Sequence, residues 1–152
     1  MANDPAITWT DKFLLGYTPM DGIHREFVDL VGKANAAADD ELPACFTAVA
    51  EHLERHFREE KEWMETTAFP HTGCHVDEHN AVLNSMSQVS ALLAKDGNLA
   101  VARSILAELV RWFPGHADYM DSALAQWMVK RVHGGAPLVF CRNITSKEKQ
   151  PA

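Results

Sequence analysis

The sequence predicts an all-α protein, an up-down-up-down four-helix bundle preceded by an N-terminal arm. Two observations lead to this prediction. Apolar residues recur at intervals of three and four along four long segments, which is the period of a helix with one buried face. Short stretches rich in Asp, Gly or Pro separate these segments, and short connections place consecutive helices side by side in antiparallel order.

The first segments along the chain are an arm and a helix. Residues 1–18 are expected to form a packed arm rather than a helix, because their apolar residues are scattered and include Gly16. The first helix is predicted to open at Pro19 and Asp21, with Asp21 serving near its N-terminus. This helix should end near residues 38–40.

Two further helices are predicted on either side of a proline-containing break. The second covers about 41–66, with Pro43 in its first turn, where a missing N–H costs little. Residues 68–70 (Ala-Phe-Pro) interrupt the pattern. The third helix covers about 71–95, and the Asp-Gly-Asn sequence at 96–98 is typical of a turn.

The fourth helix is predicted over about 99–133, with an irregularity inside it. Pro114-Gly115 should kink this helix or add a local bulge. The Gly-Gly-Ala-Pro sequence at 134–137 should end it. We therefore expect one bundle domain over 1–137 and a partly disordered C-terminal tail over 138–152.

Composition narrows the classes of function. The chain has 152 residues and a net charge of −7, which argues against a nucleic-acid partner. No signal peptide is visible at the N-terminus, and no apolar run reaches the roughly 18 residues of a membrane span. Three cysteines are too few and too scattered for a disulfide framework, so free thiols in a reducing cytoplasm are expected. The charged outer helix faces favour a monomer.

Seven side chains that can bind metal lie on the apolar faces of the predicted helices. An ionised carboxylate inside a bundle is costly unless it is paired or bound to a metal. Residues four apart stack on one helix face, and two pairs in this set have that spacing. The set therefore predicts ligands for two metal ions. Its members are His24, His56, Glu60, His75, His79, His116 and Asp121.

The spacing of His116 and Asp121 does not fit a regular helix. Five residues at about 100° each leave these two side chains roughly 140° apart. Both can reach one site only if the helix is locally wound wider or if Asp121 reaches sideways. A π-bulge would achieve this, and Pro114 makes a distortion plausible because it deprives the Val110 carbonyl of its usual partner.

Counting donors suggests a site with one vacancy. Two octahedral ions offer about twelve coordination positions. Five imidazoles fill five, two bridging carboxylates fill four, and a bridging oxide or hydroxide fills two, which leaves roughly one position open. Such a site binds one small ligand, and imidazole combined with carboxylate suits iron.

Other metal sites explain less of the sequence. The ferritin-like pattern needs Glu-x-x-His, and no histidine here has Glu three positions before it. The string from His75 to His79 matches the short His-x-x-Glu-His motif of zinc hydrolases, but that motif leaves the other five residues unexplained. Cys74 could be a soft ligand, although a small loop residue is the better interpretation. His52 and His71 lie one turn before ligands and are taken as peripheral.

At these residues the chain resembles the hemerythrin family, most closely its single-domain bacterial members. All seven ligand positions occur in order, and the resemblance spans residues 9 to 121. The matching segments are Trp9, Gly16, Met20 to Phe27, His56 to Glu60, Met64, Phe69-Pro70, His75, His79, Trp112, His116 and Asp121.

The resemblance implies two non-haem iron ions that bind dioxygen reversibly for storage, delivery or sensing. Glu60, Asp121 and an oxo or hydroxo group would bridge the ions. The remaining ligands would divide between a saturated iron, held by His75, His79 and His116, and an iron with the vacancy, held by His24 and His56. A di-iron enzyme acting on oxygen, peroxide or nitric oxide is the alternative, and a signalling module would need a separate partner.

The expected ligand pocket includes Phe57, Trp112 and Ala117. Phe57 and Trp112 could exclude water from the vacancy. The sequence is equally compatible with both residues being ordinary members of the bundle core. The family usually has a larger aliphatic residue where this chain has Ala117. A smaller side chain there predicts a larger or wetter pocket and faster autoxidation than in typical relatives.

Overall fold

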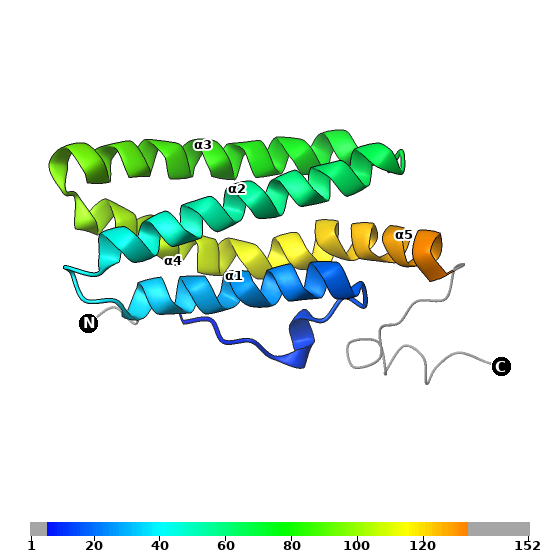
Figure 1. Ribbon diagram of the computed structural model, residues 1–152, viewed down its shortest axis with the longest axis horizontal. Coiled ribbons are helices and arrows are strands. Elements are labelled where there is room, and N and C mark those ends of the chain that lie inside the picture. The colour runs from blue at the N-terminus through cyan, green and yellow to red at the C-terminus, as the bar shows by residue number, and fades with distance from the viewer. Residues whose placement is uncertain (1–5, 134–152) are drawn as a thin grey trace.

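The computed structural model describes residues 6–133, and the predicted tail at 138–152 lies outside this range. Four long helices form the body of the molecule, the fourth continuous through three consecutive parts (Figure 1). In chain order the elements are a 3-10 turn η1 (Asp11–Phe13), α1 (Thr18–Ala36), α2 (Leu42–Thr66), α3 (Thr72–Asp96), α4 (Leu99–His116), a π-helical turn η2 (Ala117–Asp121) and α5 (Ser122–His133).

The predicted four-helix bundle is confirmed. Packing runs around a ring, with α1 against α2, α2 against α3, α3 against α4 and α4 against α1, so helices consecutive in sequence are neighbours in space. The α3–α4 turn shows the local cause: Gly97 ends α3 with a φ of 61°, and the Asn98 side chain accepts a hydrogen bond from the Val101 N–H to begin α4. None of the helices described is long and apolar enough to cross a membrane.

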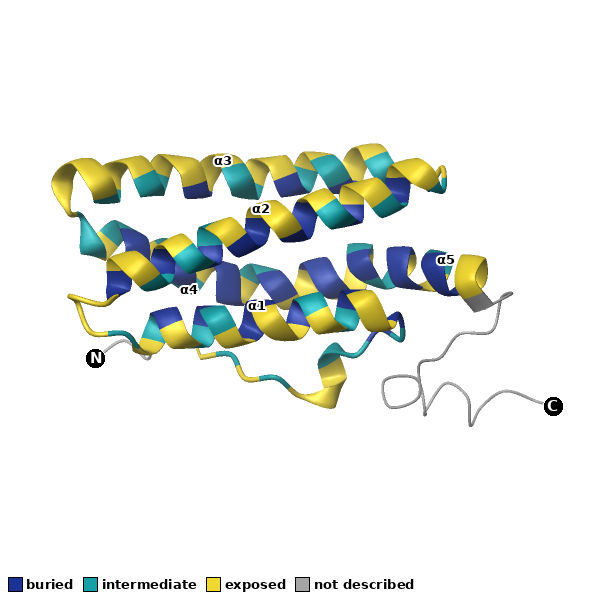
Figure 2. Ribbon diagram, in the orientation of Figure 1, coloured by how far each residue is buried: buried dark blue, intermediate teal, exposed yellow. Residues whose placement is uncertain are grey.

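A polar layer divides the apolar core into two parts. Buried residues face the inside of the bundle along every helix (Figure 2). Along α1, buried His24 lies between Met20, which belongs to one apolar cluster, and Phe27, which belongs to the other. The same division occurs along α2, between Phe57 and Met64. Apolar packing on both sides therefore isolates the polar layer from water.

The N-terminal arm lies against the bundle and contains one short 3-10 turn instead of being wholly irregular. Asp21 was expected to serve the start of α1, but its carboxylate accepts hydrogen bonds from the backbone N–H groups of Leu15 at 2.8 Å and Gly16 at 3.0 Å. Gly16 has a φ of 95°, which favours glycine. The ring of Phe13 packs 5.4 Å from that of Phe113. These contacts fasten the arm to α1 and α4.

Candidate metal centre

The structure brings all seven predicted ligands together in the polar layer. One comes from α1, two from α2, two from α3, one from the end of α4 and one from η2. All are buried, with at most 4% of the residue surface exposed. Their donor atoms form two groups that share Glu60: Glu60, His75, His79, His116 and Asp121 in one, and His24, His56 and Glu60 in the other.

The two oxygens of Glu60 face opposite sides of the cluster. Oε2 lies 2.8 Å from the Nε2 atom of His56 and 3.4 Å from that of His24. Oε1 lies 3.3 Å from Nε2 of His75 and 3.5 Å from Nε2 of His79. A carboxylate placed in this way can donate one oxygen to each of two cations.

The two carboxylate oxygens of Asp121 also face different histidines. Its Oδ2 lies 3.1 Å from Nε2 of His24, and its Oδ1 lies 3.0 Å from Nε2 of His75 and 3.1 Å from Nε2 of His116. On the latter side the Nε2 atoms of His79 and His116 are 3.0 Å apart. Two ring nitrogens at that distance repel unless a proton or a cation lies between their lone pairs.

The π-helical turn η2 solves the spacing problem of His116 and Asp121. The wider winding over Ala117–Asp121 turns both side chains toward the same point, which is the first of the two possibilities that the sequence left open. The chain remains α-helical through Pro114, and the irregularity follows that residue by three positions. The π turn is therefore the element that places Asp121, the last of the predicted ligands, beside the others.

Several donor atoms have no hydrogen-bond partner although they are fully buried. They include Nε2 of His24, Nε2 of His75, Oε1 of Glu60 and both carboxylate oxygens of Asp121. Nitrogen and oxygen atoms of this group approach one another within 3.0–3.3 Å, but without the alignment that a hydrogen bond requires. Buried polar groups are rarely left in this state. Nitrogen and oxygen lone pairs that converge without bonding fit shared cations, and the donor set suits iron.

The pKa values of the buried groups also indicate that the two carboxylates need positive charge beside them. Burial disfavours the charged form of each group, yet the neighbouring histidines hold the pKa values of Glu60 and Asp121 well below their usual range. Although burial lowers it, the pKa of His24 is raised to about 10 and that of His75 to about 9 by the two carboxylates. Burial lowers the pKa of His79 to about 3. Protons on histidine thus balance the charge that cations would otherwise balance.

Two of the three residues predicted to line the pocket stack on histidines of the cluster, and the third, Ala117, directly follows His116 in the chain. The Phe57 ring is stacked on His79, with centroids 3.8 Å apart, and the Trp112 ring is stacked on His116 at 4.3 Å. Ala117 is buried in the apolar cluster that also contains Phe57. Phe57 and Trp112 therefore cover mainly the group that contains His79 and His116.

Two other aromatic rings cover the side with fewer ligands, and the sequence analysis did not assign them to the site. Phe113 meets His24 edge-on at 5.2 Å, and Phe27 meets His56 at 6.4 Å. Phe27 lies three residues after His24 on α1, and it ends one of the segments that resemble the hemerythrin family. Phe113 lies three residues before His116, so the helical period was the available signal.

The two extra histidines differ in their environments. His71 is exposed, as a peripheral residue should be. His52 is buried with 1% of its surface exposed, and its Nδ1 lies 3.0 Å from a carboxylate oxygen of Glu26 on α1, which also pairs with Arg55. Cys74 is exposed and belongs to neither donor group.

A four-helix bundle with buried imidazole and carboxylate donors at its centre defines a metal-binding class of protein. The family model for the hemerythrin HHE cation-binding domain matches residues 15–128. A bacteriohemerythrin of Ralstonia nicotianae is 35% identical over 127 residues, which cover 84% of this chain and 92% of that protein. The chain belongs to the hemerythrin family, and this membership supports a non-haem iron protein that binds oxygen.

Proposed function

We propose that this protein binds dioxygen reversibly at a pair of non-haem iron ions, for oxygen storage, delivery or sensing. The family and the named relative support the coarse function. The observation that supports the di-iron site is the division of the carboxylate oxygens, because Glu60 and Asp121 each direct one oxygen to either side of the cluster.

The ligand roles follow from that division. Glu60 and Asp121 would each offer one oxygen to either ion, and an oxo or hydroxo group would complete the bridge. The imidazoles form two sets. Three of them lie on one side, from His75, His79 and His116, and two lie on the other, from His24 and His56. When bound, the iron pair supplies the electrons and the open position that dioxygen needs.

The protein's own side chains favour reversible binding over turnover. Phe113 and Phe27 place apolar rings against His24 and His56, where the donor set is smaller, and exclude water from that side. The nearest extra imidazole is His52, whose ring lies 5.3 Å from that of His56. Burial lowers the pKa of His52 to about 4, so its ring is neutral at pH 7 and is a poor acid for reducing a bound ligand.

The test is to load the protein with Fe²⁺ without air, admit dioxygen and follow the visible charge-transfer absorption. We expect bands that appear with oxygen and disappear on degassing, and about two irons per chain. Steady oxygen consumption in the presence of a reductant would instead identify the di-iron enzyme. An iron content far from two per chain would overturn the proposed centre.

Two histidines on neighbouring turns provide a matched pair of variants. His75 is buried in the cluster, and His71 is exposed one turn earlier. His75→Ala should lose most of the iron and the oxygen-dependent bands. His71→Ala should retain both. Equal iron binding by the two variants would contradict the ligand assignment.

A further inference from the structure

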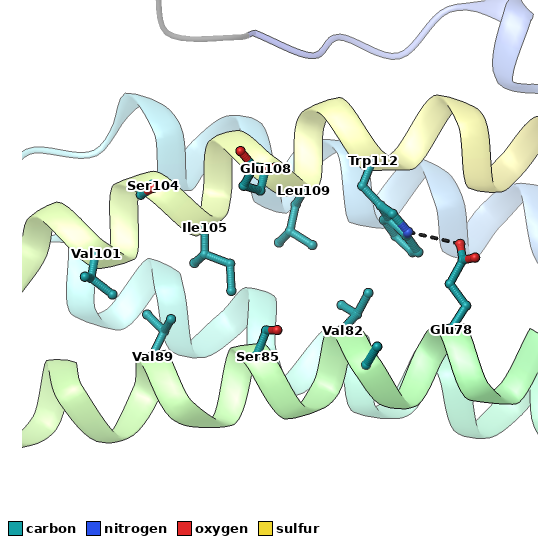
Figure 3. Close-up of a pocket in the computed structure, with 11 residues that line it drawn as sticks. Glu78, Val82, Ser85, Val89, Val101, Ser104, Ile105, Glu108, Leu109 and Trp112 are labelled. Atoms are coloured by element: carbon teal, nitrogen blue, oxygen red, sulfur yellow. Dashed lines mark hydrogen bonds between the residues drawn. The ribbon is translucent and has the colours of Figure 1, made fainter.

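Glu78 makes the best-defined contact to the cluster from outside it. Its Oε1 accepts a hydrogen bond from Nδ1 of His116 at 2.7 Å and another from the indole N–H of Trp112 at 3.1 Å. Figure 3 shows the second of these bonds crossing from α3 to α4. The carboxylate thus holds both a proposed ligand and the ring stacked upon it.

We propose that Glu78 is a positioning residue that fixes the tautomer and orientation of His116 for metal binding. A neutral imidazole carries one N–H, and an ionised carboxylate can only accept. The bond to Glu78 therefore places that hydrogen on Nδ1 and leaves the lone pair of Nε2 directed at Asp121 and His79. This inference rests on the metal centre of the proposed function but not on its reaction with oxygen.

His116 differs from the other four histidines in this respect. Within the part of the chain that the structure describes, the Nδ1 atoms of His24, His56, His75 and His79 are buried without a hydrogen-bond partner. Among the five histidines of the cluster, only His116 has its Nδ1 atom hydrogen-bonded to a side chain. His116 is the last residue of α4 and immediately precedes the π turn.

Glu78 lies at a position where its side chain can be substituted without creating a cavity in the apolar core. Glu78 is at one end of a groove of about 640 Å³ between α3 and α4, whose lining includes Val82, Ile105, Glu108 and Trp112 (Figure 3). Its side chain is 36% exposed. A truncated side chain would therefore be replaced by water, and the bundle should still fold.

The experiment compares Glu78→Ala, Glu78→Gln and Glu108→Ala as Zn²⁺-loaded proteins labelled with ¹⁵N-histidine. Zn²⁺ affinity is measured by competition with a chelator, and long-range ¹H–¹⁵N spectra report which nitrogen of His116 carries the proton. Glu108 is the matched control, because it lines the same groove but pairs with Arg111 at the surface.

We expect Glu78→Ala to weaken Zn²⁺ binding about 10–100-fold and to make the Nδ1 proton of His116 exchange faster with water. Glu78→Gln should retain the tautomer, because an amide oxygen still accepts the bond. Glu108→Ala should behave as the wild type. The inference fails if Glu78→Ala keeps wild-type affinity and slow exchange, or if Glu78→Gln loses the tautomer. A wild-type protein that binds no metal would overturn the proposed centre itself, and the inference with it.

Discussion

The metal centre depends on which atom of each side chain faces inward. All five histidines direct Nε2 at a carboxylate oxygen or at another Nε2, and both carboxylates direct their two oxygens to opposite sides. Rotating one of these side chains by a single rotamer would take its donor atom away from the group that the atoms form together. Close packing by the aromatic rings stacked on His79 and His116 opposes such rotation.

Ala117 provides a prediction at the residue scale. The iron-loaded Ala117→Ile variant should autoxidise more slowly than the wild type, because additional methyl groups beside the buried cluster displace water. The measurement is the rate at which the oxygenated absorption bands decay in air. Overpacking could cost about 1–3 kcal/mol of stability, so unfolding is followed in parallel.

Ala94→Ile is a suitable control for this variant. Ala94 is exposed near the end of α3, so the same change in side chain leaves the site untouched. The explanation is wrong if the absorption bands of Ala117→Ile decay at the wild-type rate. It is also wrong if Ala117→Ile and Ala94→Ile slow the decay equally.

At the scale of elements, the fourth helix contains the decisive departure from regularity. A continuous α-helix over 99–133 would direct His116 and Asp121 to different sides, whereas η2 brings Oδ1 of Asp121 to 3.1 Å from Nε2 of His116. Pro114, just before this turn, cannot donate a hydrogen bond to the preceding turn. The helix thus contains both a missing hydrogen bond and a π turn close to the site.

Pro114→Ala should raise the free energy of unfolding of the metal-free protein by about 1–3 kcal/mol, because alanine restores the N–H that an interior proline lacks. Urea denaturation measures the change. Pro43→Ala is the matched control: Pro43 is equally exposed but lies in the first turn of α2, where no N–H is missed, so little change is expected. A larger gain from Pro43→Ala than from Pro114→Ala would contradict this account.

At the scale of the whole molecule, a layer of charged and ionisable groups crosses the bundle between two apolar clusters. Glu60 and Asp121 are fully buried there, and an unmatched buried charge is strongly destabilising. Removing metal leaves protonated histidines as the balancing charges. Metal binding and folding are therefore coupled in this protein, and metal removal should lower its melting temperature.

Metal binding should release protons, and its affinity should fall as the pH falls. In the metal-free protein the pKa of His24 is about 10 and that of His75 about 9, so both rings hold a proton at pH 7. A ligand imidazole must give up that proton, and although burial lowers it, the pKa of His116 is also raised by Asp121 and Glu78, so at least about two protons should leave per chain. Lower pH favours the protonated form and opposes binding.

Calorimetric titration with Zn²⁺ in buffers of different ionisation enthalpy measures this release. The slope of the observed enthalpy against buffer enthalpy gives the number of protons. A slope near zero, or an affinity that does not change between pH 6 and pH 8, would show that the rings are already neutral.

The helices, the candidate ligand set and a conflict with regular helix geometry near His116 could all be predicted from the sequence. These features are local: apolar periodicity marks the inward face of each helix, and the five-residue gap to Asp121 conflicts with the geometry of a regular helix. The N-terminal arm was also predictable in outline, because scattered apolar residues without helical period pack without forming a long element.

The way in which the helices combine at the centre could not be predicted and is known from the folded structure. It showed which oxygen of Glu60 faces which imidazole, that Phe113 from α4 covers His24 on α1, and that Glu78 on α3 anchors His116. It also showed that Asp21 binds the arm, by hydrogen bonds that span five and six residues. These contacts depend on the rotation and relative height of packed helices, which the period within a single helix does not specify.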